Sequence, residues 1–293
     1  MSLYENYIKR SETNTFALRN INKEKLMLFV KRDDLIHPEI SGNKFRKLKY
    51  NIEKAKAHHC ESIISYGGAY SNHLLALAAV GRLENFKTIG VVRGDELNPG
   101  SNRLLKRCTE LGMQLRFIER TKYKLEKYRD GIQDTGLRSI LHIPEGGANL
   151  EGILGCRDII QETSNDFDYI FVAQGTCTTS LGICMAMSSQ SKLVAVPVLK
   201  GFNGLSEMKD LAKKVNLSVD LSRVEVLQDY HFGGYAKSNK VLSEFIESFN
   251  GRHKFNIEQV YTGKAMFAMH NFLKGVTGNK KALFIHTGGL YHL

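Results

Sequence analysis

The chain has 293 residues with 42% hydrophobic and 24% charged content, values typical of a globular enzyme with one large or two modest domains. A net charge of +11 would suit nucleic acid or small anions, but no basic run interleaved with aromatic residues and no nucleic-acid motif occurs. The five cysteines form no CxxC pair, no apolar run approaches the ~20 residues of a membrane helix, and no signal peptide is visible. We therefore expect a cytoplasmic protein that binds neither metal, membrane nor nucleic acid.

Segments typical of strands and helices alternate along the first half. Phe45, Leu48, Ile52 and Ala55 recur at helical spacing after residue 44, so we expect a helix there with most of its lysines on the solvated face. Further expected strands are 62–66, 88–92, 114–118 and, more weakly, 139–143, and the expected helices are 71–82 and 101–111.

The second half repeats this alternation. Its expected strands are 169–173, 193–198, 224–227 and 282–285, and its expected helices are 151–163, 179–189, 205–215, 237–249 and 264–272. Strands separated by helices indicate parallel sheets joined by right-handed crossovers. Two such series predict an α/β protein of two open three-layer αβα domains, each with a mostly parallel twisted sheet, and a ligand cleft between them.

Lys44 stands in Ser41-Gly42-Asn43-Lys44, a small-residue turn that enters the helix. A lysine amine held in this way can form a Schiff base with the aldehyde of pyridoxal 5′-phosphate (PLP). The chain has 41 lysines and arginines, nearly all of which must be solvated. Lys44 stands out only in combination with other motifs.

Residues 67–73 follow a strand and open a helix. The backbone N–H groups there, with the Ser71 hydroxyl and the Asn72 amide, could hold a carboxylate. The alternative is that Ser71 or Asn72 caps the helix and the two glycines form a tight turn. His73 by itself is better interpreted as a satisfied polar residue than as a catalyst.

Two more loops follow strands in the second half. Residues 175–180 could cradle a phosphate with consecutive N–H groups and hydroxyls, although the segment is no P-loop and could be a plain capped junction. Cys177 is not interpreted as a nucleophile, since no histidine is placed beside it. Thr287 could hydrogen-bond a heteroaromatic nitrogen, or it could belong to a surface turn.

Tyr235 and Tyr261 lie beside glycines at strand ends. Such tyrosines are more often structural than catalytic. A phenol held in a PLP site can nevertheless relay a proton.

Together these segments resemble the D-cysteine desulfhydrase / 1-aminocyclopropane-1-carboxylate (ACC) deaminase family, within the tryptophan synthase β-like, fold type II PLP enzymes. The resemblance runs from Lys31-Arg32-Asp33-Asp34 to His286-Thr287-Gly288-Gly289, nearly the whole chain. Its specific motifs are Ser41-Gly42-Asn43-Lys44, Gly67-Gly68-Ala69-Tyr70-Ser71-Asn72-His73, Pro144-Glu145-Gly146-Gly147-Ala148-Asn149 and Tyr261-Thr262-Gly263-Lys264-Ala265. It implies PLP in a cleft between a larger domain, residues 1–48 and 158–293, and a smaller one, residues 49–157.

The resemblance also implies a role for each site residue. Lys44 would be the Schiff-base lysine, with Asn43 beside the phenolic oxygen of the cofactor. Gly175, Thr176, Cys177, Thr178 and Thr179 would hold the phosphate, and Thr287 would face the pyridine nitrogen. Ser71, Asn72 and His73 would bind the substrate carboxylate, with Ser71 also joining proton transfer. Tyr235 and Tyr261 would line the substrate side.

Family members that deaminate ACC usually carry glutamate where this chain has Thr262, and leucine where it has Thr287. We therefore expect α,β-elimination from D-cysteine to pyruvate, sulfide and ammonia, with ACC deamination to 2-oxobutyrate and ammonia as the alternative. β-Replacement, racemisation and PLP binding without catalysis stay open. A homodimer is expected by resemblance alone.

Two departures from the family pattern concern loop geometry. The phosphate loop carries Cys177 and Thr178 where small residues are common, and the β-carbon of Thr178 constrains any positive φ angle there. Ala236 replaces the glycine that usually follows the tyrosine at position 235.

Overall fold

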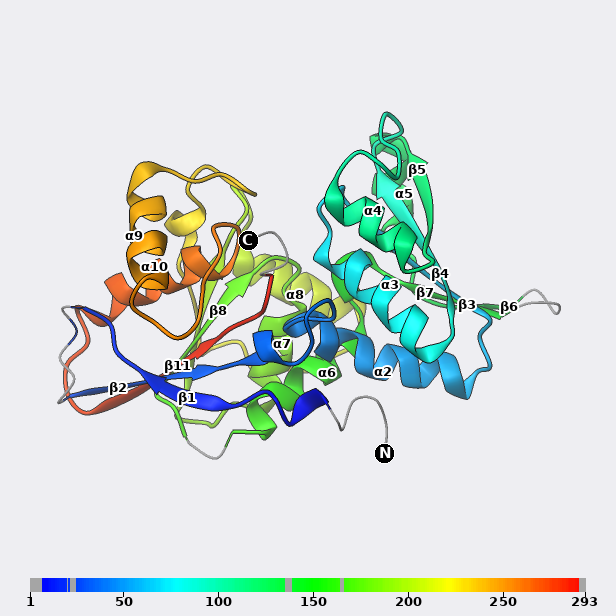
Figure 1. Cartoon of the computed structure of the whole chain (residues 1–293). Coiled ribbons are helices and arrows are strands. Elements are labelled where there is room, and N and C mark those ends of the chain that lie inside the picture. Colours follow the sequence, from blue (N-terminus) through cyan, green and yellow to red (C-terminus); the bar gives the residue numbers. More distant parts are fainter. Residues whose placement is uncertain (1–6, 20, 22–24, 135–138, 164–165, 290–293) are drawn as a thin grey trace. The chain divides into compact units, whose positions relative to one another are not determined.

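The computed structural model describes residues 7–19, 21, 25–134, 139–163 and 166–289. By its internal contacts the chain divides into two compact units (Figure 1). The larger unit comprises Met1–Ile36, Ser41–Asn43 and Cys156–Leu293, and the smaller unit comprises His37–Ile40 and Lys44–Gly155. Two helices run across these boundaries: α2 (Asn43–Ala57) begins with one residue of the larger unit, and α6 (Leu150–Gln161) ends in it.

The larger unit is built on a six-stranded sheet in the order β1-β2-β11-β8-β9-β10. β1 pairs antiparallel with β2, and all other neighbours are parallel. The strands are β1 (Thr13–Phe16), β2 (Leu26–Lys31), β8 (Tyr169–Gln174), β9 (Lys192–Pro197), β10 (Val224–Val226) and β11 (Lys280–Ile285). The carboxyl ends of β8 and β11 therefore meet at one edge, which brings the loops after them close together.

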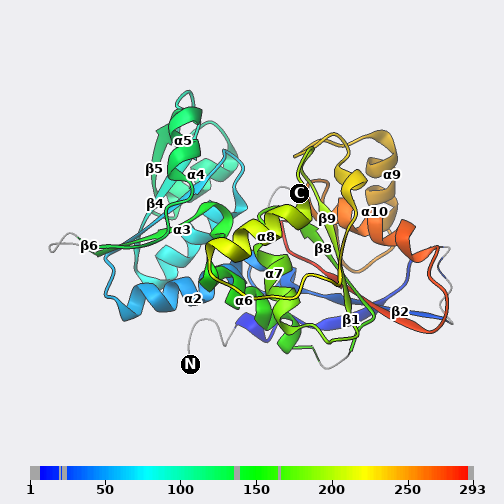
Figure 2. The same ribbon diagram turned by 180° about the vertical axis from the view of Figure 1, so that it is seen from behind.

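Helices cover both faces of this sheet. α9 (Lys240–Asn250) and α10 (Thr262–Leu273) lie on one face, and α7 (Thr178–Ala186) and α8 (Gly204–Lys214) lie on the other (Figure 2). Short 3₁₀ turns occur at Asp33–Leu35 and Gln228–His231. Period-2 alternation along β8 sends Phe171 and Ala173 into the same buried cluster as Met266 and Met269 of α10.

The smaller unit holds a five-stranded sheet in the order β5-β4-β3-β7-β6, in which only the β6–β7 pair is antiparallel. Its strands are β3 (Ser62–Gly67), β4 (Lys87–Arg93), β5 (Gln114–Ile118), β6 (Gly131–Asp134) and β7 (Ser139–Ile143). Besides most of α2, its helices are α3 (Asn72–Glu84), α4 (Arg103–Glu110), α5 (Arg120–Glu126) and a 3₁₀ turn at Glu145–Gly147. The prediction of two α/β units with mostly parallel sheets is confirmed.

The sequence analysis missed several elements and misjudged one helix face. It did not identify β1, β2, β6 or α5. In α2, Lys47 is buried, so the expectation of solvated lysines is wrong for this residue, and Arg46 beside it is buried as well. A β-carbon at Gly155 would overlap the carbonyl oxygen of Arg46, which shows that α2 and α6 pack with their backbones in contact. Lys47 meanwhile donates from Nζ to the carbonyl of Gly146 at 3.0 Å.

Two properties of the described residues bear on function class. No helix among them is long and apolar enough to cross a bilayer. Within the same ranges, no group of three or more histidine, cysteine, aspartate or glutamate side chains is arranged to hold a metal ion.

Candidate active site

The turn before Lys44 lies against the end of β11. Gly42 has a φ of +64°, and a β-carbon there would overlap the carbonyl oxygen of Thr287. The Gly42 N–H donates to the carbonyl of Asp33 at 3.0 Å, and the Asn43 N–H donates to that of Thr287 at 3.3 Å. Only glycine satisfies both the left-handed φ and the close approach. The turn therefore brings Asn43 beside Thr287, which is itself buried.

Asn43 also reaches the start of α7. Its Nδ2 donates to Thr179 Oγ1 at 2.8 Å, and both side chains are buried. Three residues predicted to bind the cofactor, Asn43, Thr179 and Thr287, are thus brought together within the larger unit from three distant segments. Lys44 is the next residue of α2 and is half-buried.

The loop between β8 and α7 leaves a helix N-terminus without a side-chain cap. Cys177 occupies the N-cap position with a φ of +60° and provides no capping hydrogen bond. The first intrahelical bond runs from Leu181 N–H to the Cys177 carbonyl at 2.9 Å, so the N–H groups of Thr178, Thr179 and Ser180 have no acceptor within the helix. Such an end attracts an anion, and the phosphate of PLP fits it. The positive φ considered for Thr178 falls on Cys177 instead.

Tyr235 and Tyr261 come together beside this loop. Their ring centroids are 6.0 Å apart in an edge-to-face arrangement. A β-carbon at Gly175 would stand 3.4 Å from Cε1 of Tyr261, so that ring packs directly against the loop. Tyr235 remains 43% exposed, which leaves its phenol accessible.

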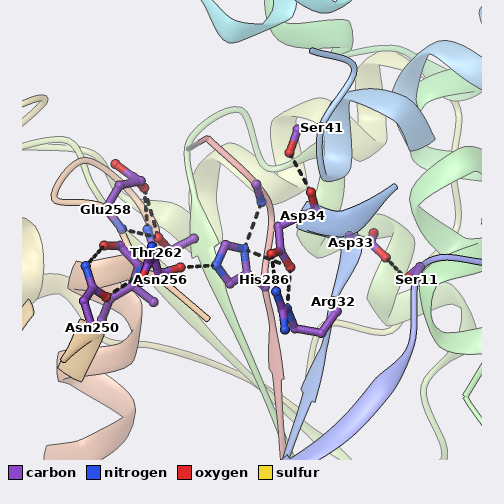
Figure 3. Close-up of polar contacts among 12 residues, drawn as sticks. Ser11, Arg32, Asp33, Asp34, Ser41, Asn250, Asn256, Glu258, Thr262 and His286 are labelled. Carbon is purple, nitrogen blue, oxygen red and sulfur yellow. Dashed lines mark hydrogen bonds and ion pairs between the residues drawn. The ribbon is translucent and has the colours of Figure 1, made fainter. Parts of the chain in front are cut away.

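The buried carboxylate of Glu258 fixes the backbone of Tyr261. Glu258 accepts hydrogen bonds from the N–H groups of Val260, Tyr261 and Thr262 at 2.6, 2.8 and 2.8 Å (Figure 3). The Thr262 hydroxyl also lies 3.2 Å from this carboxylate and accepts from the Glu258 N–H at 2.9 Å. Glu258 thereby caps α10 and sets the backbone of Tyr261.

The buried imidazole of His286 fixes the turn that carries Thr287. His286 Nε2 donates to the Asn256 carbonyl at 2.6 Å, and Nδ1 accepts from the Gly288 N–H at 3.3 Å (Figure 3). A neutral imidazole satisfies both contacts. Asp34 Oδ1 lies 3.6 Å from Nδ1, too far for a hydrogen bond, and is held by Arg32 in two bonds of 2.8 Å. This network joins the Lys31–Asp34 motif to the loop that carries Thr287.

In the smaller unit, Ser71 is the N-cap of α3. Its Oγ accepts from the Leu74 N–H at 3.3 Å, and Asn72 is the first helical residue. The capping alternative for Ser71 is therefore confirmed. A role in binding a carboxylate stays a prediction for Ser71 and Asn72.

His73 is buried and only half satisfied. The Ser65 hydroxyl donates to the Ile143 carbonyl at 2.8 Å, so His73 Nε2 must donate to Ser65 Oγ at 3.0 Å. Nδ1 is left as a buried acceptor that has no partner among the described residues. Burial, followed by the charges of Lys47 and Lys44, lowers the pKa of His73 to about 3. The ring is neutral, and the expectation of a satisfied polar residue holds for one nitrogen only.

The sequence analysis gave no role to Glu258, and it quoted Asp34 and His286 only as motif members. An acidic residue just before a predicted helix start is a recognisable signal, because it can cap the free N–H groups there. The contacts of Asp34 and His286 join residues far apart in the chain, and no local pattern indicates them.

A cavity of about 900 Å³ in the larger unit is lined by residues of β1, β2, α9 and the loop after α9. None of the predicted site residues lines it. The predicted cofactor site is therefore defined by the contacts above and not by this cavity.

Comparison with known proteins shows the family of the chain. Residues 9–288 match the family described as "Pyridoxal-phosphate dependent enzyme". A protein of Pyrococcus furiosus named "Putative 1-aminocyclopropane-1-carboxylate deaminase" is 31% identical over 95% of this chain and 90% of its own length. The Arabidopsis thaliana protein named "Bifunctional D-cysteine desulfhydrase/1-aminocyclopropane-1-carboxylate deaminase, mitochondrial" is 26% identical over 91% of this chain and 73% of its own length.

Solved structures indicate the same family. The structure titled "Crystal Structure Analysis of the ACC deaminase homologue" aligns with a TM-score of 0.79 and 26% identity, covering 96% of this chain and 90% of the other. A PLP-dependent aspartate racemase aligns with a TM-score of 0.68 at 14% identity, which shows a shared fold alone. The chain is a PLP-dependent enzyme. It belongs to the D-cysteine desulfhydrase / ACC deaminase family.

Proposed function

We propose that this enzyme is a lyase that eliminates the β-substituent of a small amino acid, and that D-cysteine is its substrate, giving pyruvate, sulfide and ammonia. The observation that carries the choice of substrate is the position of Thr262. Its hydroxyl is engaged with Glu258 just before α10, and as a threonine it offers no acid to the substrate. Members of the family that deaminate ACC usually carry a glutamate at this position.

We assign the cofactor to the larger unit. The uncapped N-terminus of α7, with Thr176 and the residues after it, would hold the phosphate, and the buried Thr287 would face the ring nitrogen. A neutral hydroxyl at that nitrogen supports less charge on the ring than a carboxylate would. When bound, PLP supplies an electron sink for the charge left on the α-carbon after proton removal.

Lys44 would supply the amine that holds the cofactor and, once freed by the substrate, takes the α-proton. In that role the amine would lie close to the α-carbon of the substrate, so no external base would be needed. The edge-to-face pair of Tyr235 and Tyr261 would move a proton to the departing sulfur. Phenol hydroxyls suit this step because they both donate and accept.

The start of α3 would bind the substrate carboxylate. The N–H groups of its first turn and the amide of Asn72 are donors, and the helix dipole favours a negative charge there. His73 stays neutral, so it would contribute polarity and shape without a charge. Ser71 caps the helix and could pass a proton as well as bind the carboxylate.

ACC deamination is the second candidate, and it is favoured by the names of the Pyrococcus furiosus and Arabidopsis thaliana relatives. ACC carries no α-hydrogen, so its ring must open by a different first step. β-Replacement, racemisation and PLP binding without turnover are further candidates. We also propose a homodimer, which is supported by family resemblance, and a cytoplasmic location, which is supported by the five unpaired cysteines of the sequence.

The test is a panel of D- and L-amino acids together with ACC, assayed for keto acid, ammonia and sulfide. We expect D-cysteine to give pyruvate and sulfide in equal amounts, and Lys44→Ala to lose both turnover and the visible absorption of a lysine–PLP Schiff base. If ACC gives 2-oxobutyrate while D-cysteine gives nothing, the preferred substrate is wrong. A visible band without turnover of any amino acid would point to a PLP-binding protein.

A further inference from the structure

Lys264 is a fully buried lysine whose partners are carbonyl groups. It lies in the first turn of α10, with none of its side chain exposed. Its Nζ donates to the carbonyl of His231 at 2.9 Å and to that of Gly234 at 2.7 Å. Among the described residues it forms no ion pair with an acid. Burial lowers the pKa of Lys264 to about 8 although the charge of Glu258 acts to raise it, so a lysine retained at this position calls for an explanation.

Besides the bonds from Lys264, the loop is held by the Gly233 N–H, which donates to His231 Nδ1 at 2.9 Å, and by the Phe232 ring, which meets Phe267 edge-to-face. Four of the five residues 232–236 have positive φ angles: Phe232, Gly233, Gly234 and Ala236 at +50°, +95°, +119° and +54°. Its own backbone bonds are the Gly234 N–H to the His231 carbonyl at 3.0 Å and the Lys237 N–H to the Gly234 carbonyl at 3.1 Å. Glycines give such a segment many alternative conformations. The two bonds from Lys264 fasten both ends of its central turn.

The loop carries Tyr235. This residue directly follows Gly234, whose carbonyl Lys264 binds, and its ring meets Tyr261 edge-to-face. Tyr261 is the N-cap of α10, three residues before Lys264. Lys264 therefore ties the segment that carries one tyrosine to the helix whose start carries the other.

We propose that Lys264 is a positioning residue that sets Tyr235 against Tyr261, an inference that rests on the proposed function in which Tyr235 moves a proton. Lys264 does not touch the reacting atoms in this role. A methionine of similar length would fill the space but leave each of the two carbonyls with its backbone N–H donor alone. The loop would then sample other conformations, and Tyr235 would lose its place.

A double-mutant cycle in the PLP-loaded enzyme tests this directly. Tyr235→Phe should lower kcat by about 10²-fold if the phenol acts as a general acid. Lys264→Met should lower kcat to a similar value with little change in KM, and the double variant should be no slower than Tyr235→Phe. Lys264→Arg should recover part of the loss. Lys274→Met, which removes an exposed lysine just past the same helix, is the control and should match the wild type.

A fluorescence measurement gives a second readout that needs no turnover. The chain contains no tryptophan, so Tyr235→Trp introduces a single tryptophan into the loop, which can be excited selectively over the tyrosines. Adding Lys264→Met should lower its anisotropy and increase quenching by acrylamide, and adding Lys274→Met should change neither. Lys264→Gln is the substitute should the methionine variant not fold.

The outcomes are distinguishable. The positioning role would be overturned if the losses in kcat were additive in the double variant. It would also be overturned if Lys264→Met left the anisotropy and quenching of the tryptophan unchanged. If the wild type turns over no amino acid, the proposed function fails, and the fluorescence result still decides whether Lys264 orders the loop.

Discussion

Gly42 and Thr287 approach so closely that a β-carbon on Gly42 would overlap the carbonyl oxygen of Thr287. This contact joins the turn that precedes Lys44 to the residue predicted to face the cofactor ring. Because Gly42 also has a φ of +64°, two independent constraints require glycine at this position.

Gly42→Ala should therefore destabilise the protein by roughly 3 kcal/mol or more, because the overlap is with backbone and cannot be relieved by a side-chain rotation. Cofactor retention should fall with it. Urea unfolding and the visible absorption of the PLP-loaded protein measure the two effects. Gly278→Ala is the matched control: its φ is +79°, but nothing lies within 4 Å of the added carbon, so it should cost only about 1 kcal/mol. Equal losses in the two variants would show that the close approach to Thr287 is unimportant.

Glu258→Gln should lower the free energy of unfolding by about 1.5–3 kcal/mol. The amide keeps one acceptor oxygen but cannot serve the N–H groups of Val260, Tyr261 and Thr262 as a carboxylate does. Urea unfolding at neutral pH gives the value. Glu247→Gln, an exposed position on α9, should change stability by less than about 0.5 kcal/mol. A Glu258→Gln variant as stable as this control would contradict the capping role.

His73 should make the protein sensitive to mild acid. Its pKa is about 3 in the folded protein and near 6.5 when unfolded, so the unfolded chain binds the extra proton between these values and stability falls as the pH drops from 6.5 toward 3. From pH 7.5 to pH 5 this contribution amounts to about 2 kcal/mol. His73→Gln should lose that part of the pH dependence of unfolding, whereas His58→Gln at an exposed site should keep it. The prediction fails if both variants follow the wild-type profile.

Ala236→Gly should stabilise the protein by about 0.5–1 kcal/mol. The alanine is exposed with a φ of +54°, and relief of left-handed strain outweighs the added flexibility of glycine in the unfolded chain. Ala57→Gly, at an exposed position at the end of α2, should act in the opposite direction by a similar amount. Thermal unfolding of the two variants compares the signs, and a loss of stability in Ala236→Gly would mean that Ala236 is not strained.

Local patterns were sufficient for much of the architecture. The alternation of apolar runs with helical periods identified β3, β4, β8 and β9, and glycines and hydroxyl residues after strands located the loops before α3 and α7. The N-cap position of Ser71 was among the alternatives because serine at a helix start has a local preference.

Short and partly exposed elements are harder to predict from the sequence. β1 and β6 are four residues long and lie at sheet edges, where a strand carries no continuous apolar run. β2 is more strongly buried, but it ends at Lys31, which also begins the Lys31–Asp34 motif. The segment was therefore interpreted as part of that motif and not as a strand. The burial of Lys47 was not predicted because helical spacing identifies an apolar stripe and does not reveal a second element packed beside it.

The order of strands, helices and cofactor-binding motifs was thus encoded in residue patterns a few positions long, because backbone preferences and side-chain periodicity act over such distances. The tertiary fold alone established that Gly42 meets Thr287 and that Lys264 reaches the carbonyls of His231 and Gly234. These contacts depend on which distant segments the parallel pairing of β2, β11 and β8 brings to the same edge of the sheet. The pairing of strands is decided by burial summed over the whole sheet, so it cannot be predicted from a single motif.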